Sequence, residues 1–114
     1  MLMSASLPKP HQAARLFAAL ADPTRLALIV TLRSGIPRPI ARLAATAGMT
    51  RQAVTKHLRI LENAGLVTVA RTGRETHYSY QPGALDPART ALDAIAGNWS
   101  AVHVPDQPEN PSAV

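Results

Sequence analysis

The chain of 114 residues has no cysteine. This absence excludes a disulfide framework, a thiolate nucleophile, and any zinc, iron–sulfur or arsenic site that is built on cysteine. Large side chains are also scarce, because aromatic residues make up 4% of the sequence and 21 of its hydrophobic residues are alanine. The composition predicts one domain of small, closely packed helices, for which association with a second copy would add buried surface.

The sequence also has no long hydrophobic run, and it does not start with a basic segment followed by an apolar one. We therefore expect no membrane span and no secretory leader, and we place the protein in the cytoplasm. A phosphate-cradling glycine loop is missing, and Asp22, Glu62 and Glu75 lie on separate predicted elements. We expect neither an enzyme nor a bound cofactor.

Acidic residues are few in the first three quarters of the chain. Residues 1–85 hold eleven lysines and arginines against three acidic residues, a net charge of +8, whereas residues 86–114 have a net charge of −3. The whole chain carries +5. A basic body of this kind favours a polyanionic partner, which by charge alone could be nucleic acid or an anionic membrane.

Patterns of a folded domain occupy residues 10–103, between two tails, 1–9 and the proline-containing 104–114, that we expect to be disordered. Residues 11–21 predict an amphipathic helix whose buried face consists of Ala13, Phe17, Leu20 and Ala21. Asp22 and Pro23 predict the capped start of a second helix. The buried stripe of that helix is predicted to be Leu26, Ile29 and Val30.

Residues 40–67 hold the most informative pattern, two short helices joined by a turn over 48–50. Gly48 ends the first helix and Thr50 caps the second. The apolar positions of the two helices are Ile40, Leu43, Ala44 and Ala47, and then Val54, Leu58 and Leu61. Two helices joined in this way are typical of a helix-turn-helix motif.

Residues 66–71 and 75–80 alternate in character on either side of a turn at 72–74, which predicts a β-hairpin with basic residues at its tip. A helix-turn-helix followed by such a hairpin is a winged helix. We therefore predict a mainly α fold with a two-stranded β wing.

A last helix is predicted to start with Asp86 as its cap and Pro87 in its first turn. Its apolar residues recur every three or four positions, which is typical of a helix that packs against another helix. We expect this helix and the first one to form a homodimer. The predicted dimer interface comprises Phe17, Leu85, Leu92, Ile95, Trp99 and Val102.

Three blocks in this order, LFAALADPTRLALIVTL (16–32), TRQAVTKHLRILENAGLV (50–67) and TGRETHYSYQPG (72–83), resemble the ArsR (also SmtB) family of bacterial winged-helix repressors. The resemblance covers roughly residues 10–103. It implies a homodimer that binds an inverted-repeat operator in double-stranded DNA and blocks transcription, usually until a chemical signal releases it.

The buried stripe of the second motif helix leaves a polar face outward, and its first two turns are those that enter the major groove. The residues that we assign to base reading are Arg51, Gln52, Thr55 and Lys56, of which Lys56 also suits a phosphate. Predicted backbone contacts are Thr50, His57, Arg59, Arg38 and Arg42, and predicted minor-groove contacts of the wing are Arg71 and Arg74. The alternative is an ordinary solvated surface with a charged hairpin tip.

Two questions stay open at the level of sequence. Asp93, His103 and Asp106 could form an oxygen–nitrogen metal site with a second copy, although their spacing is incomplete and they could equally be solvated polar residues. Trp99 could pack in the seam or line a small-molecule pocket, so the effector is not identified. An alternative function is a winged-helix adaptor for protein or RNA, which should show apolar residues where Arg51, Gln52, Thr55 and Lys56 stand.

Overall fold

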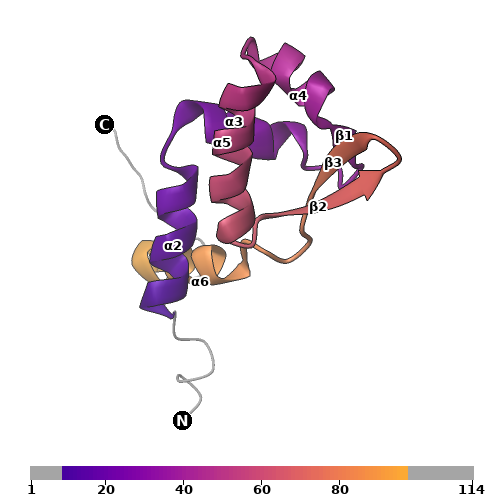
Figure 1. Cartoon of the computed structure of the whole chain (residues 1–114). Coiled ribbons are helices and arrows are strands. Elements are labelled where there is room, and N and C mark those ends of the chain that lie inside the picture. Colours follow the sequence, from indigo (N-terminus) through magenta and orange to yellow (C-terminus); the bar gives the residue numbers. More distant parts are fainter. Residues whose placement is uncertain (1–8, 98–114) are drawn as a thin grey trace.

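The computed structural model describes residues 9–97. Five helices and a small antiparallel sheet follow one another, with the α2–α6 pair at one end, the sheet at the other and α5 between them (Figure 1). The elements are α2 (Pro10–Leu20), α3 (Pro23–Thr31), β1 (Arg38–Pro39), α4 (Ile40–Ala47), α5 (Arg51–Asn63), β2 (Val67–Thr72), β3 (Glu75–Tyr80) and α6 (Asp86–Ala96). This order confirms the predicted mainly α fold with a β wing.

The helix-turn-helix is formed by α4 and α5, and here the sequence prediction is confirmed in detail. Gly48 has a left-handed backbone, with φ +66°, and the Thr50 hydroxyl oxygen accepts a hydrogen bond of 3.0 Å from the backbone N–H of Ala53. The side chains of Val54, Leu58 and Leu61 are fully buried. Three buried positions along one face fix the rotation of α5 about its own axis, and so decide which residues face outward.

Helix α3 begins as predicted but buries a different stripe. The Asp22 carboxylate accepts hydrogen bonds from the backbone N–H groups of Thr24 (2.9 Å) and Arg25 (3.0 Å). The core contains Leu28, Ile29 and Leu32, whereas Leu26 and Val30 are half exposed, so the prediction was wrong for these two. Because α3 is apolar on almost every side, helical periodicity could not choose among its faces.

The predicted buried face of α2 is confirmed at Ala13, and Phe17 and Leu20 are partly buried against the core. Leu16 and Ala19 are buried as well, whereas Ala21 is exposed, so the prediction was wrong for Ala21. Helix α6 packs against α2 through Ala88 and Ala91, and Gly97 ends the helix with φ +73°. Asp86 is not the cap, because the helix begins at Asp86 itself and Leu85 takes the capping position. Trp99 and Val102, predicted for the seam, lie outside the described residues.

The sheet has three strands in the order β1–β3–β2, one more than predicted. Strand β1 pairs Arg38 with Tyr78 and Pro39 with His77. A proline is tolerated there because β1 is an edge strand and needs no N–H on its outer side. The hairpin turn is also one residue shorter than predicted, since Thr72 pairs with Glu75. Gly73, with φ +63°, supplies the left-handed residue of this tight turn.

Candidate nucleic-acid interface

The outward face of α5 carries the residues predicted to read bases. Arg51, Gln52 and Lys56 are exposed, and Arg59 follows on the next turn. Thr55 is half-buried, and its hydroxyl donates a hydrogen bond of 2.6 Å to the backbone oxygen of Arg51. Because the opposite face is locked in the core, these side chains are held outward by the packing of the whole helix.

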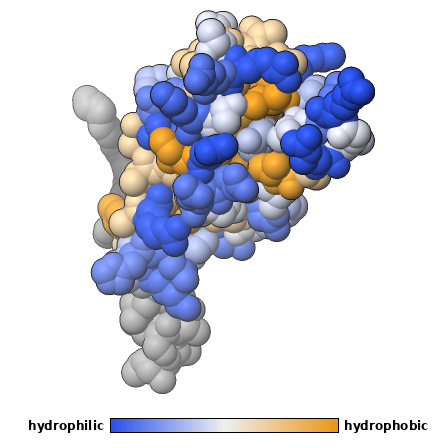
Figure 2. Space-filling view, viewed as in Figure 1, coloured by the Kyte–Doolittle hydropathy of each residue, from blue (hydrophilic) through white to orange (hydrophobic). Residues whose placement is uncertain are grey.

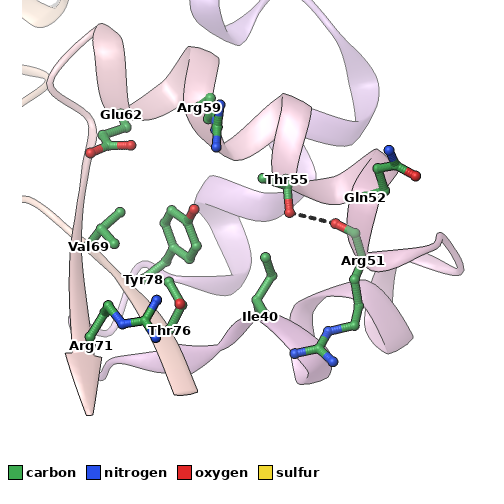
Figure 3. A pocket seen from close by; sticks show the side chains of 10 residues that line it. All are labelled: Ile40, Arg51, Gln52, Thr55, Arg59, Glu62, Val69, Arg71, Thr76 and Tyr78. Carbon is green, nitrogen blue, oxygen red and sulfur yellow. Dashed lines mark hydrogen bonds between the residues drawn. The ribbon is translucent and has the colours of Figure 1, made fainter. Parts of the chain in front are cut away.

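A groove of about 550 Å³ separates this face from the sheet. Figure 3 shows Arg51 and Arg71 on opposite sides of it, with Tyr78 between them. Burial raises the pKa of the Tyr78 hydroxyl, and the nearby Glu62 carboxylate raises it further, so the hydroxyl stays protonated. The full lining is Ile40, Arg51, Gln52, Thr55, Arg59, Glu62, Val69, Arg71, Thr76 and Tyr78.

Five of these lining residues were not predicted as site residues, namely Ile40, Glu62, Val69, Thr76 and Tyr78. Thr76 and Tyr78 are two apart on β3 and therefore share one face of the sheet, a signal that the alternation of the sequence did contain. Glu62 could not be placed from the sequence, because its position beside the sheet depends on how α5 crosses β2.

The remaining predicted cations lie on three different elements. Arg42 on α4 is exposed, as are Arg71 and Arg74 on the wing, the hairpin of β2 and β3. Arg38 is half-buried in β1, and its Nε atom is buried without a hydrogen-bond partner among the described residues. Figure 2 shows hydrophilic residues gathered over much of this face, with small hydrophobic patches between them.

His57, predicted as a phosphate contact, is half-buried and its ring is engaged within the protein. Its Nδ1 atom lies 3.4 Å from Nη1 of Arg25 and 3.7 Å from a carboxylate oxygen of Asp22. The pKa of Asp22 is lowered, chiefly by the hydrogen bond from the backbone N–H of Arg25 and also by the positive charge of the Arg25 side chain. The ring therefore joins α5 to the start of α3.

The predicted dimer residues form an apolar surface on α2 and α6. Phe17 and Leu85 are partly buried, whereas Leu92 is 53% exposed and Ile95 is 78% exposed. An apolar groove of about 350 Å³ runs between the two helices and is lined by Pro10, Ala13, Ala14, Phe17, Ala91, Ala94 and Ile95. Large side chains that point outward in this way leave the face unpartnered in a single chain.

Of the three residues considered for a metal, Asp93 is exposed on α6, and His103 and Asp106 lie outside the described residues. Within residues 9–97, no three histidine, aspartate or glutamate side chains come together as a metal site would require. Over the same range, no helix has the length and hydropathy of a membrane span.

Comparison with known proteins gives a consistent result. A family model described as "Helix-turn-helix domain" matches residues 20–70. The chain is 36% identical over 104 residues to a probable mercury resistance operon repressor of Streptomyces lividans, covering 89% of this chain and 82% of that protein. It is also 38% identical over 93 residues to the transcriptional repressor SmtB of Mycobacterium tuberculosis, of which it covers 67%. The chain belongs to the ArsR/SmtB family.

Solved structures of this family agree with the fold. An ArsR-like transcriptional regulator from Rhodococcus is 33% identical and superposes with a TM-score of 0.65, over 80% of this chain and 85% of that one. A homodimeric winged helix-turn-helix DNA-binding domain from Mycobacterium bovis is 28% identical, with a TM-score of 0.60. The match to the regulator NmtR of Mycobacterium tuberculosis reaches 46% identity, but the chain covers only 56% of that ArsR/SmtB relative.

Proposed function

We propose that the protein is a sequence-specific DNA-binding transcriptional regulator that acts in the cytoplasm, binds an inverted-repeat operator as a homodimer, and represses transcription. The observation that carries this proposal is the outward face of α5, where Arg51, Gln52 and Lys56 are exposed in the first two turns. A helix held in this way presents its N-terminal half to the major groove. Relatives named as transcriptional regulators and as an operon repressor support the same role.

The side chains on this face suit distinct contacts. Arg51 offers the two-pronged donor that matches guanine, and Gln52 offers the amide that matches adenine. The Thr55 hydroxyl already donates its hydrogen to the Arg51 carbonyl, which leaves its methyl group and an acceptor lone pair for a base edge. Lys56, Arg59, Arg42, Arg38 and Thr50 would bind phosphates, and Arg71 and Arg74 would reach the minor groove.

His57 is left out of this set because its ring contacts Arg25 and Asp22. The polar, basic character of the α5 face gives no support to a protein-binding adaptor. The second copy would cover Leu92 and Ile95, and would set two α5 helices roughly 34–36 Å apart, one turn of DNA.

Two alanine variants test the assignment, with binding followed by fluorescence anisotropy at several salt concentrations. The probes are the duplex that the protein enriches from a randomised pool and a scrambled duplex. Arg51→Ala should cost about 1–3 kcal/mol on the enriched duplex and relax the preference at one base pair. Lys56→Ala should weaken binding to both duplexes and lower the salt slope by about 1.

Equal losses on both duplexes for Arg51→Ala would remove this residue from the base-reading set. If the unmodified protein binds no duplex at any salt concentration, the proposed function is itself wrong.

A further inference from the structure

On its exposed side, the contact between α2 and α5 is lined mostly by small side chains. A shallow groove of about 240 Å³ is lined by Ala18 and Ala19 of α2 and, across from them, by Ile60 of α5 and by Ala64, the residue that caps α5. Methyl groups that meet across such a gap make few close contacts, and dispersion attraction falls steeply with separation. On this side, apolar packing therefore constrains the angle between α2 and α5 only weakly, whereas on the inner side Leu16 of α2 lies in the same core as Leu58 and Leu61 of α5.

Arginine side chains link the two helices at both ends of this groove. Nη2 of Arg15, on α2, donates a hydrogen bond of 2.7 Å to the backbone oxygen of Asn63, the last residue of α5. At the other end, Nε of Arg25 donates to the backbone oxygen of Ala19 at 2.6 Å, and its Nη2 lies 3.5 Å from the oxygen of Ala18. One guanidinium thus binds the carbonyl of Ala19 in the last turn of α2 and lies beside that of Ala18, which also accepts from the backbone N–H of Ala21.

The same guanidinium reaches the middle of α5, where its Nη1 atom lies 3.4 Å from Nδ1 of His57. Arginine has donors only, so a hydrogen bond between these two atoms requires the neutral His57 ring with its proton on Nε2 and with Nδ1 as the acceptor. Asp22 completes the cluster, because its carboxylate caps α3 and lies 3.7 Å from the same ring nitrogen. The end of α2, the start of α3 and the middle of α5 meet at Arg25.

We propose that Arg25 and His57 are positioning residues that set the angle between α2 and α5, and through it the spacing of the two DNA half-sites. The inference rests on the proposed function. Helix α2 packs against α6, which carries the exposed face assigned to the dimer. The angle between α2 and α5 therefore decides how far apart two α5 helices lie, and each added base pair changes the half-site separation by about 3.4 Å.

The test uses the duplex enriched by the unmodified protein, together with versions whose spacer between half-sites is one or two base pairs longer or shorter. We expect His57→Ala to lower the preference for the best spacer by about tenfold, because the variant loses a hydrogen bond to the charged Arg25 guanidinium. The base preference within each half-site should be the same as that of the unmodified protein. His57→Asn should restore part of the spacer preference, because the asparagine Oδ1 can accept from Arg25 near the position of Nδ1.

Lys56→Ala, next to His57 on the same helix, is the matched control and should weaken binding to every spacer equally. Arg25→Lys keeps the charge but cannot bridge Ala19 and His57 together, so it should lose spacer preference too. It replaces His57→Ala if that variant is unfolded at the assay temperature, as judged by thermal melting.

An unchanged spacer preference in folded His57→Ala or Arg25→Lys would overturn the inference. So would an equal loss of affinity for all spacers, because that result indicates a purely structural role. Failure of the unmodified protein to bind any duplex would instead contradict the proposed function.

Discussion

The two ends of the molecule arrange their side chains in opposite ways. Around α5, large apolar side chains such as Leu58 are fully buried, and the charged ones face outward. In the α2–α6 pair, the buried residues are alanines except for Leu16, while Leu92 and Ile95 are 53% and 78% exposed. At the α5 end, a single chain buries its large apolar side chains and exposes charged ones. At the α2–α6 end, it leaves an apolar face that a partner could cover.

The two ends also differ in charge, a difference that the overall net charge of +5 does not reveal. The positive charge belongs to residues 1–85, which include α5 and the wing, and the net charge of residues 86–114, which include α6, is negative. Substitutions at the two ends should therefore affect different properties of the protein.

The largest effect on the chain's own stability is expected at the α5 end. Leu58→Ala should lower the free energy of unfolding by about 2–5 kcal/mol, because it leaves a cavity in a fully packed site. Leu92→Ala removes the same group from an exposed site and should change the stability of the monomer by less than about 0.5 kcal/mol. Urea denaturation at low protein concentration measures both. Similar losses for the two variants would contradict the contrast between the two ends.

Self-association should depend on the α2–α6 end. Ile95→Glu should weaken the dimer by about 2 kcal/mol or more, because it would bury an unpaired carboxylate in an apolar interface. Ile60→Glu is the matched control, since Ile60 is also an exposed isoleucine but lies on α5. Sedimentation equilibrium should detect weaker association for the first variant only. Equal effects would show that this face of α6 is not the interface.

A smaller effect is expected at Asp22, which lies between the two ends. A carboxylate with a lowered pKa stabilises the fold above its ordinary pKa of 3.8 and loses that effect as the pH falls through the lowered value. The melting temperature of Asp22→Ala should therefore be below that of the unmodified protein at neutral pH, and the difference should shrink in acid. A difference that persists undiminished at about pH 2 would contradict this account.

The sequence predicted the fold best where polar residues mark the outer face. In α5, charged and amide side chains separate clearly from Val54, Leu58 and Leu61, so periodicity found the buried stripe and hence the outward residues. Helix α3 lacks such a contrast, and its stripe was predicted wrongly for Leu26 and Val30. Strand β1 was missed because two residues carry no period, and its pairing with β3 spans the whole helix-turn-helix.

Parts of the candidate site depended on contacts between distant elements. His57 lies three residues after Val54 and four before Leu61, at the edge of the buried stripe, so the sequence could not tell whether its ring points to DNA or to α3. The positions of Arg25, Glu62 and Tyr78 likewise follow from how α5 packs against α2, α3 and the sheet. Sequence periodicity predicts individual helices and their buried faces, but it does not predict which distant elements pack together.

A pair of α5 helices that reads DNA sequence in a symmetric dimer should select a symmetric site. Selection of duplexes from a randomised pool by the unmodified protein, followed by sequencing, tests it most directly. We expect enrichment of a two-fold symmetric motif whose half-sites lie about one helical turn apart. Enrichment of a single asymmetric half-site, or no enrichment over the starting pool, would contradict it.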